Sequence, residues 1–461
     1  MIFHKWTRIF ILAPLLLGLI RSTPAQAQTS VPKLLWCPAT VTTPTPKQYG
    51  CTPAFTSMTA LWTHLTTHMP SQAGTIWIGA GYNSVAAGDS NLGFDGLVLT
   101  KMAKYPLSFK GGWKGPGTSA LNVQSPATLQ GHTFAVANWK GKVYIRNFKV
   151  VLNAASTATL CANAAICVKT AGGILLDRVH VEGDNTSTVD YGAFLDNSDS
   201  LSSPPGSVVV TNSTFLKNKN SGLSIVTKGA VSVKSVITNE NGYYGTIIYN
   251  TFDDTASPVT VTNGQFNQNA TDGLALVSNG TVTLTNLLAE GNRYGIFVDN
   301  TPGVGNVVLK GTNTFLGNDL TGLTIASHGS VNAGKLVAYQ NATTGVFIDN
   351  SAAPSAKGVT LIGSGTFIGN GSNGFFVSSK GNVSLTGVIA GSNAVGIQVQ
   401  AIGSITLSCS GASDNDIGLY VRPLNVSDPL KLTLKGVLSY GNTTNEDIVA
   451  DPIVRTACPT G

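Results

Sequence analysis

The clearest pattern in this chain is a repeated alternation of apolar and polar positions in short runs. From residue 206 onward one unit recurs, as in 206–228 (GSVVVTNSTFLKNKNSGLSIVTK) and 258–279 (PVTVTNGQFNQNATDGLALVSN). Each unit has an alternating run, a second short run, an Asn, a Gly and a third short run. Alternation with a period of two is typical of β-strands with one buried face. The pattern therefore predicts three short strands per unit.

An asparagine marks the same place in each of these units. A Gly follows it three or four positions later in nine of ten units. Asn tolerates left-handed backbone conformations and bonds to neighbouring backbone groups, and Gly adopts positive φ without strain. We expect the Asn side chains to stack at one corner of successive coils, as a ladder that binds turn carbonyls. The asparagines recur at steps of 22 to 29 residues: Asn218, Asn241, Asn269, Asn292, Asn318, Asn341, Asn370, Asn393, Asn415 and Asn442.

A repeat of this length predicts a solenoid in which each coil covers its neighbour. The apolar positions of the first strand should then point inward and fill the core. Eight of them are Val208, Val210, Val231, Val233, Val282, Leu284, Val383 and Leu385.

The repeats resemble right-handed parallel β-helix proteins of the pectin-lyase-like superfamily, in particular bacterial secreted or surface β-helix proteins. The resemblance rests on the Asn, the Gly and the apolar triplet after it, and covers roughly residues 140–450. It implies an all-β fold, a single-stranded right-handed parallel β-helix with three short strands per coil.

The beginning of the chain is similar to the N-terminal cap of that group. A helix-like segment at 55–68 is followed by GTIWIGAGYN at 74–83 and YPLSFKGGW at 105–113. The predicted organisation is a short helical cap with the first coils over 28–115, a β-helix over 116–450 and a C-terminal tail over 451–461.

The N-terminus predicts export. Lys5 and Arg8 precede an apolar run at 9–20, and Ala25-Gln26-Ala27 fits a cleavage site. The run is shorter than the roughly 20 residues that a membrane span requires. We therefore predict a signal peptide over 1–27, with a short membrane anchor as the alternative, and no membrane span in the mature chain. The expected location is secreted, extracellular or on the cell surface, with the periplasm as an alternative.

The cysteines agree with export. All six lie after the signal, and an even number in an exported chain predicts three disulfides, although six cysteines allow fifteen pairings. Pairing between nearest neighbours would join Cys37 to Cys51, Cys161 to Cys167, and Cys409 to Cys458.

Composition narrows the choice of partner. Charged residues make up only 11% of the 461 residues, and the formal net charge is +6. Removing the signal lowers this charge to +3, because Lys5, Arg8 and Arg21 leave with it. Such a weak and scattered positive charge argues against a nucleic-acid partner, which would require clustered Lys and Arg.

Large apolar residues recur outside the predicted coils. Long connections tend to follow alternate coils, and there the outward residue of the third strand is Ile247, Phe297, Phe347 or Tyr420. We expect the long loops to cover this stripe, because exposed apolar stripes are unfavourable, with Phe376 as an exposed exception. The four aromatic residues Phe297, Phe347, Phe376 and Tyr420 are candidate binding residues for a polysaccharide, a cell-surface glycan or a protein partner.

One aspartate matches an enzyme signature of the superfamily. The segment NATDGLAL at 269–276 is similar to the Asn-Thr-Asp-Gly signature of polygalacturonase-like β-helices, which implies a catalytic role for Asp272. An inverting hydrolase needs a second carboxyl group, and the same position of the other coils holds none. The Asp-Asp, Gly-His-Gly and Arg-x-Lys motifs of that family are also absent. A turn-capping Asp is the alternative interpretation.

A second candidate lies earlier in the chain. Along a strand, Asp177, Val179 and Val181 should share one face, and Arg178, His180 and Glu182 the other. Pectate-lyase-like sites combine carboxylates that hold Ca²⁺ with an Arg or Lys base, so Arg178, His180 and Glu182 are a candidate catalytic row. A solvated, self-neutralising strand face is the alternative.

Calcium is the one cofactor that the sequence gives reason to consider. Oxygen ligands could come from acidic residues of the predicted loops. These residues belong to different coils, so we predict no cofactor and no metal site. They are Asp196, Asp199, Asp253, Asp254, Asp299 and Asp349.

Three functional classes follow from these patterns. The first is a non-catalytic extracellular or surface module that binds a polysaccharide or a protein partner. The second is a polysaccharide lyase or glycoside hydrolase acting on an acidic polysaccharide, and the third is a purely structural rod. The missing catalytic motifs favour the first class, since a fold alone does not confer an activity.

Overall fold

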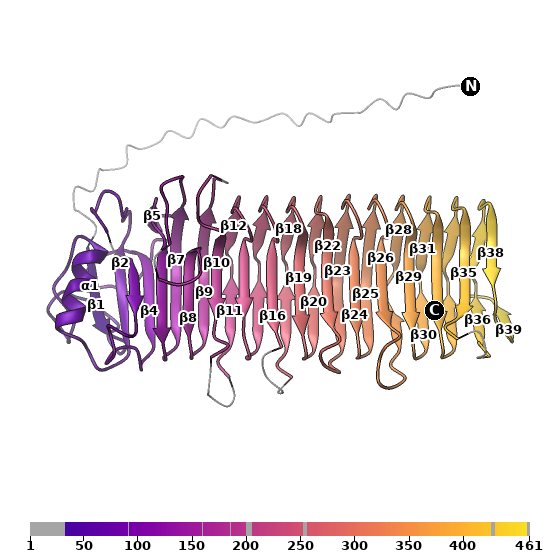
Figure 1. The fold of residues 1–461 in the computed structure, drawn as a ribbon, viewed down its shortest axis with the longest axis horizontal. Coiled ribbons are helices and arrows are strands. Elements are labelled where there is room, and N and C mark those ends of the chain that lie inside the picture. Colours follow the sequence, from indigo (N-terminus) through magenta and orange to yellow (C-terminus); the bar gives the residue numbers. More distant parts are fainter. Residues whose placement is uncertain are drawn as a thin grey trace, which may run out of the picture. The chain divides into compact units, whose positions relative to one another are not determined.

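The computed structural model describes residues 33–90, 92–158, 160–184, 186–199, 205–251, 256–425 and 429–458. These residues belong to one compact unit, Pro32–Gly461. Short strands stack coil upon coil along one axis, as Figure 1 shows. The unit is an all-β parallel β-helix with one helix near its N-terminal end, which confirms the predicted fold class. The predicted signal peptide, 1–27, lies outside the described residues.

A typical coil contributes two strands to one sheet and one strand to another. In one such coil these are β14 (Val231–Lys234), β15 (Ile237–Asn239) and β16 (Thr246–Asn250). The first two belong to the sheet that we call sheet A, and the third to sheet B. Each strand pairs in parallel with its equivalent one coil further on, so that Val231 lies beside Val259.

Among the described residues, sheet A contains the first and second strands of the coils. They are β1 (Leu34–Pro38), β2 (Gly74–Gly79), β4 (Leu107–Trp113), β5 (Ala127–Gln130), β7 (Val143–Val151), β9 (Ile174–Glu182), β11 (Val208–Thr211), β12 (Thr214–Leu216), β14, β15, β17 (Val259–Thr262), β18 (Gln265–Asn267), β20 (Val282–Thr285), β21 (Leu288–Glu290), β23 (Val307–Leu316), β25 (Val331–Tyr339), β27 (Val359–Leu361), β28 (Gly365–Ile368), β30 (Val383–Thr386), β31 (Val388–Gly391), β33 (Ile405–Ser408), β34 (Gly411–Ser413), β36 (Leu432–Lys435), β37 (Leu438–Tyr440) and β39 (Ile453–Thr456).

Sheet B contains the third strands. They are β3 (Gly93–Asp95), β6 (Phe134–Trp139), β8 (Ala164–Thr170), β10 (Tyr191–Asp196), β13 (Leu223–Val226), β16, β19 (Asp272–Ser278), β22 (Tyr294–Asn300), β24 (Leu323–Ser327), β26 (Val346–Asn350), β29 (Asn373–Ser379), β32 (Val395–Ala401), β35 (Ile417–Pro423) and β38 (Thr444–Ile448).

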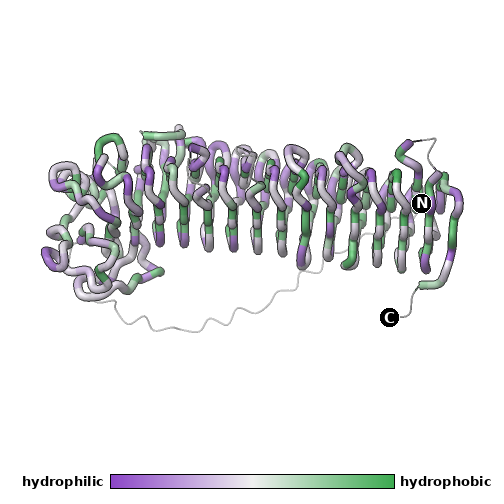
Figure 2. The backbone as a smooth tube through the Cα atoms, turned by 90° about the horizontal axis from the view of Figure 1, so that it is seen from below, coloured by the Kyte–Doolittle hydropathy of each residue, from purple (hydrophilic) through white to green (hydrophobic). Residues whose placement is uncertain are grey.

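The core runs along the inside of the stacked coils. All eight first-strand residues that we expected inside, from Val208 to Leu385, are at most 2% exposed. Polar residues alternate with them on the outer face, and Figure 2 shows apolar and polar segments alternating around the coils. The prediction of a solenoid whose coils bury one another is thus confirmed.

A second repeat, two coils long, lies inside the core. The inward row of the second strands alternates large and small side chains, because neighbouring coils are only about 4.8 Å apart and two bulky rings would compete for the same space. The row reads Phe266, Ala289, Phe315, Ala338, Phe367 and Ala390. The sequence analysis found a two-coil repeat only on the outer face.

The asparagine ladder is present. Asn292, for example, donates from Nδ2 to the carbonyl oxygen of Phe266 at 2.7 Å and to Oδ1 of Asn318 at 3.2 Å. Its own Oδ1 accepts from the backbone N–H and the Nδ2 of Asn269 at 2.9 and 3.0 Å. Equivalent Asn-to-Asn bonds run from Asn218 to Asn442. From Asn241 onward the rungs therefore provide partners for polar groups that the stacked coils would otherwise bury, whereas Oδ1 of Asn218, in the first rung, has no partner among the described residues.

The left-handed backbone conformation that we expected at the Asn and at the Gly is not found at either residue. The left-handed residue of each corner is the one before the Asn, such as Lys217 with φ of 55° or Gln340 with φ of 54°. The Gly after the Asn is needed for space instead. A Cβ on Gly345 would lie 2.5 Å from the carbonyl oxygen of Gly374 and 2.9 Å from Nδ2 of Asn370.

The N-terminal cap has the predicted elements. Helix α1 (Met58–Thr67) begins after Ser57, whose side chain accepts from the N–H of Ala60, as an N-cap should. The helix buries Met58, Leu61 and Leu65 against the main core. Strand β1 pairs antiparallel with β2, in contrast to the parallel pairs of the coils.

Three disulfides join the cysteines in the predicted nearest-neighbour pairing: Cys37–Cys51, Cys161–Cys167 and Cys409–Cys458. The last of them ties the C-terminal segment to the stack. Within that segment, which we expected as a tail, β39 pairs in parallel with β36 and extends sheet A. Within the described part of the chain, none of the helices has the length and hydrophobicity that a membrane span requires.

Candidate functional site

The candidate site lies on the outer face of sheet B, around Asp272. This residue begins β19 and lies beside Tyr294, the first residue of β22 in the next coil. Tyr244 precedes β16 at the same corner of the preceding coil. The backbone N–H of Gly245 donates to the carbonyl oxygen of Asp272 at 3.0 Å, which fixes the two coils at this point.

A pocket of about 540 Å³ opens here, and we call it the Asp272 pocket. Its residues come from four consecutive coils of sheet B and the corners before their strands. None of the described lining residues lies in the long loops, which we expected to cover the apolar stripe, and residues 252–255 after β16 lie outside the described residues. The lining residues are Tyr243, Tyr244, Ile247, Tyr249, Thr271, Asp272, Ala275, Val277, Arg293, Tyr294, Phe297 and Thr324.

The carboxyl group of Asp272 is the chemically distinctive group of the pocket. Burial raises the pKa of Asp272 to about 6, and the positive charge of Arg293 opposes this shift only in part. Within the described residues the carboxyl group has no hydrogen bond or ion pair to stabilise its charged form. The turn-capping role considered for Asp272 therefore finds no hydrogen bond to support it. A half-buried acid with a raised pKa in a pocket is a typical feature of functional sites.

Four of the twelve described lining residues of the pocket are tyrosines. The rings of Tyr243 and Tyr244 meet edge to face, with centroids 4.4 Å apart. Burial raises the pKa of Tyr244, and the hydrogen bond with Tyr243 and the charge of Asp272 raise it further. Arg293 lies over the ring of Tyr294, 5.7 Å from its centroid. The wall therefore offers aromatic faces together with phenol hydroxyls and one guanidinium group.

An unused polar atom also lies in the pocket. The Oγ1 of Thr271 is buried and has no hydrogen-bond partner in the described part of the chain. A buried hydroxyl without a partner costs free energy unless a water or ligand satisfies it. Thr271 thus adds a second polar group, next to Asp272, that a bound molecule could satisfy.

The raised pKa leads to a prediction about stability. The pKa of Asp272 lies above the value of about 3.9 that Asp has in an unfolded chain, so the folded protein keeps a proton that the unfolded chain loses. Stability should fall as the pH rises from about 4 to about 6, and the loss should persist above pH 6. We expect Asp272→Asn to raise the melting temperature at pH 8 by about 1–3 °C and to leave it unchanged at pH 4.

Calorimetric melting of the wild type and the variant over this pH range tests the prediction. Asp319→Asn is the matched control, because Asp319 is exposed in the corner after ladder residue Asn318. The control should follow the wild type at every pH. A melting temperature of Asp272→Asn that stays below the wild type at pH 8 would show that the Asp272 charge is stabilising.

The other candidate binding aromatics lie further along the same face. Phe297 lines the pocket, whereas Phe347 and Phe376 form a separate ring pair with centroids 4.9 Å apart. Phe376, which we expected to be exposed, is half-buried because its ring packs on Phe347. Arg422 lies 4.6 Å from the ring centroid of Tyr420. Of the four candidate aromatic residues, only Phe297 lines the same pocket as Asp272.

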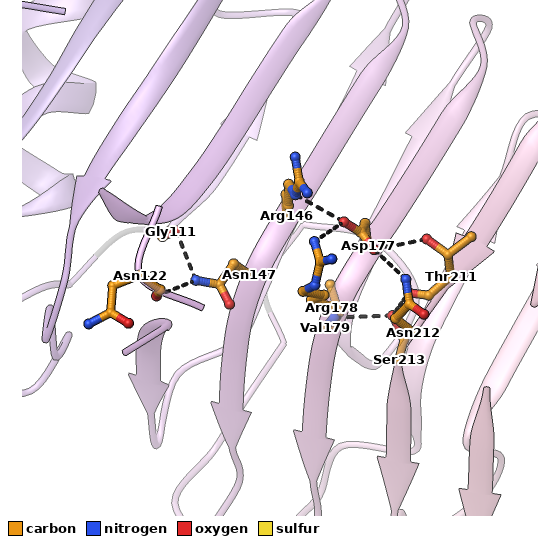
Figure 3. Close-up of polar contacts among 10 residues, drawn as sticks. All are labelled: Gly111, Asn122, Arg146, Asn147, Asp177, Arg178, Val179, Thr211, Asn212 and Ser213. Atoms are coloured by element: carbon orange, nitrogen blue, oxygen red, sulfur yellow. Dashed lines mark hydrogen bonds and ion pairs between the residues drawn. The ribbon is translucent and has the colours of Figure 1, made fainter. Parts of the chain in front are cut away.

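The cluster at 177–182 lies elsewhere, on sheet A, as Figure 3 shows in part. The expected division of its faces is wrong for Asp177, because Arg178 has a φ of 54° and breaks the alternation of the strand. Asp177 therefore lies outside, where Arg146 and Arg178 both approach its Oδ2 at 2.9 Å. Thr211 and Asn212 donate to its other oxygen at 3.0 and 2.9 Å. The carboxylate is saturated within its own surroundings.

His180 and Glu182 remain neighbours on this outer face. The His180 Nε2 lies 3.7 Å from Glu182 Oε2, which also lies 3.8 Å from the Lys149 ammonium group. Burial lowers the pKa of His180, and the charge of Lys149 lowers it further, against the opposing effect of Glu182. Lys149 and Glu182 neutralise each other's charge here. This cluster lies on sheet A, whereas the Asp272 pocket lies on sheet B. The structure therefore does not join Arg178, His180 and Glu182 to Asp272.

The acidic loop residues serve the turns that contain them. One oxygen of Asp196, Asp299 and Asp349 accepts from the backbone N–H two residues further on, at 2.9 to 3.0 Å. Asp199 lies 3.5 Å from the Lys169 ammonium group, and Asp253 and Asp254 lie outside the described residues. Across the described ranges no three His, Cys, Asp or Glu side chains are placed to hold a metal ion.

Comparison with known proteins agrees with this fold. Residues 164–361 match the sequence model of the family described as the right handed beta helix region. This match covers the central coils of the parallel β-helix that the structure shows. No curated protein sequence matches it.

Among solved structures, two crystal structures of the periplasmic alginate epimerase AlgG are similar. The double mutant shares 14% identity with a TM-score of 0.37, and the match covers 87% of each chain. The unmutated protein shares 14% identity with a TM-score of 0.36 over 87% of this chain and 88% of the other. These values are too low to transfer an activity.

Sequence reasoning missed most of the pocket. It singled out Asp272, Ile247 and Phe297, and it noted only that the other coils have no carboxylate at the position of Asp272, which Tyr244 and Tyr294 occupy. One signal could have identified these two tyrosines: they occupy the corner position of Asp272 in the coils before and after it. The contribution of Tyr243, Tyr249 and Arg293 becomes visible only once neighbouring coils are stacked.

Proposed function

We propose that this chain is an exported β-helix protein that binds a polysaccharide in the Asp272 pocket of sheet B. Export is supported by the pattern of the first 27 residues and by the three disulfides, which persist in oxidising compartments. The observation that carries the binding proposal is the pocket wall itself.

The wall matches the chemistry of a sugar ring. Sugars present apolar C–H faces, which pack on aromatic rings, and hydroxyls around their edge, which need donors and acceptors. The pocket supplies the rings of Tyr244, Tyr294 and Phe297 for the first purpose. It supplies Asp272 and the unpartnered hydroxyl of Thr271 for the second. Pockets that mix aromatic walls with a few polar groups are typical of small-molecule binding sites.

Binding to a panel of soluble polysaccharides, measured by affinity electrophoresis and calorimetry, tests this proposal. Tyr294→Ala should weaken binding about tenfold or more, which corresponds to about 1.4 kcal/mol. Tyr339→Ala is the matched control, because Tyr339 is half-buried on the outer face of sheet A, away from the pocket. Equal binding by wild type and Tyr294→Ala would contradict the proposal.

A polysaccharide-modifying enzyme is the second candidate, and the raised pKa of Asp272 favours it. A carboxyl group that titrates near pH 6 can exchange a proton with a substrate close to neutrality. Asp272 is the one carboxylate among the described lining residues, and a hydrolase would require a second carboxylate beside it.

Mass spectrometry of the bound polysaccharides, with and without Ca²⁺, separates the two candidates. Products that form with the wild type and disappear with Asp272→Asn would establish an enzyme. Binding without products would leave the non-catalytic module.

A further inference from the structure

The outer face of sheet B continues past the Asp272 pocket as a regular row. Strand register places one residue of each coil in this row, from Phe297 through Thr324, Phe347, Phe376 and Gln398 to Tyr420. Phe297 and Phe347 are two coils apart, and so are Phe376 and Tyr420. At about 4.8 Å per coil, the rings of each pair are separated by roughly 10 Å along the axis.

The middle of the row has the features of a second site. Phe347 and Phe376 form a tilted ring platform, with centroids 4.9 Å apart and an interplanar angle of 37°. Asn373 occupies the position equivalent to Asp272 at the corner of its coil, and its Nδ2 donates to Oε1 of Gln398 at 2.9 Å. An aromatic platform beside a pair of amides offers the same combination of apolar and polar groups as the pocket.

The charges beside the row favour one class of ligand. Asp299 and Asp349 lie two positions after Phe297 and Phe347, along the edge of the row. The cation at the corresponding position of the last coil, Arg422, is paired with Asp447 at 2.5 Å. Beyond Arg293 in the pocket, a polyanion lying on the described part of this row would therefore meet the carboxylates of Asp299 and Asp349, and like charges repel.

We propose that the Phe347–Phe376 platform is a second glycan subsite, and that the ligand is a neutral linear polysaccharide lying along the axis from the Asp272 pocket. This inference rests on the proposed binding function. A separation of two coils is close to the length of a disaccharide unit in an extended chain, so equivalent sugars would meet the rings. The sugars between them would face the smaller Thr324 and the amide of Gln398.

The test compares oligosaccharides of increasing length by calorimetry with the mature chain. The neutral series are cello-, manno- and xylo-oligosaccharides, and oligogalacturonates are the acidic series. Affinity for one neutral series should rise about tenfold once the chain is long enough to span both sites. Phe347→Ala and Phe376→Ala should remove this gain and leave binding of the shortest oligosaccharides unchanged.

Two further variants serve as controls for this test. Phe347→Leu keeps the apolar volume without the ring, so it should lose the gain even if the alanine variant folds poorly. Ile389→Ala is the control, because Ile389 is 54% exposed on β31 of sheet A. It should behave as the wild type.

The outcomes separate the two proposals. If Tyr294→Ala abolishes binding but affinity is independent of length, or the Phe347 and Phe376 variants keep the gain, the pocket stands and the second subsite is wrong. Stronger binding of oligogalacturonates would overturn the assignment of a neutral ligand. If neither series binds at any length, the proposed binding function fails together with this inference.

Discussion

Asn341→Ala is expected to lower the free energy of unfolding by about 2–6 kcal/mol. The Asn341 side chain accepts from the backbone N–H and the Nδ2 of Asn318 at 3.2 and 2.7 Å. It donates to the carbonyl oxygen of Phe315 at 3.2 Å and to Oδ1 of Asn370 at 2.9 Å. Alanine would leave at least two buried backbone groups, the N–H of Asn318 and the carbonyl of Phe315, without these partners. Each costs about 1–3 kcal/mol.

Denaturant unfolding and hydrogen exchange measure this effect. Because each coil contacts mainly its neighbours, faster exchange should be concentrated in β23, β25 and β28. Asn332→Ala is the matched control, since Asn332 is half-buried on the outer face of β25, the strand that precedes Asn341 in the same coil. If Asn341→Ala lowers the free energy of unfolding by no more than the control does, the ladder does not stabilise the protein.

Phe315→Ala should destabilise the protein by about 3–5 kcal/mol, the range for removing a buried ring from a packed core. Phe315 is fully buried, and its neighbours in the inward row are Ala289 and Ala338. Neither alanine can extend into the space that the ring would leave, so a cavity should remain. The two-coil alternation of large and small residues thus makes protein stability sensitive to substitution at the Phe positions.

Two variants check this explanation by the same denaturant measurement. Phe315→Leu keeps part of the volume and should cost clearly less than Phe315→Ala. Ala338→Phe should also destabilise, by about 1–3 kcal/mol or more, because it places a ring beside both Phe315 and Phe367. If Ala338→Phe is neutral or stabilising, the alternation is not a packing requirement.

The candidate site was predictable only in part. The Asn-Thr-Asp-Gly-like segment singled out Asp272, and the outward position of the third strand singled out Phe297. The interpretation of 177–182 was weaker, because a left-handed residue at Arg178 is not encoded in an alternating pattern. It changes the face on which Asp177 lies and brings Asp177 into a saturated ion cluster with Arg146 and Arg178.

The sequence by itself determined the solenoid, the inward rows and the Asn ladder, whereas it left fifteen disulfide pairings open, of which the structure shows the one between nearest neighbours. These features depend on a local periodicity that repeats in every coil, so they can be recognised from the amino-acid sequence alone. Only the tertiary structure decided which side chains meet across coils. Tyr244, Asp272 and Tyr294 follow one another at intervals of 28 and 22 residues along the chain, yet they line one pocket. The reason is that the stacking register, set by backbone hydrogen bonds between coils, brings corresponding positions within about 5 Å of one another along the axis.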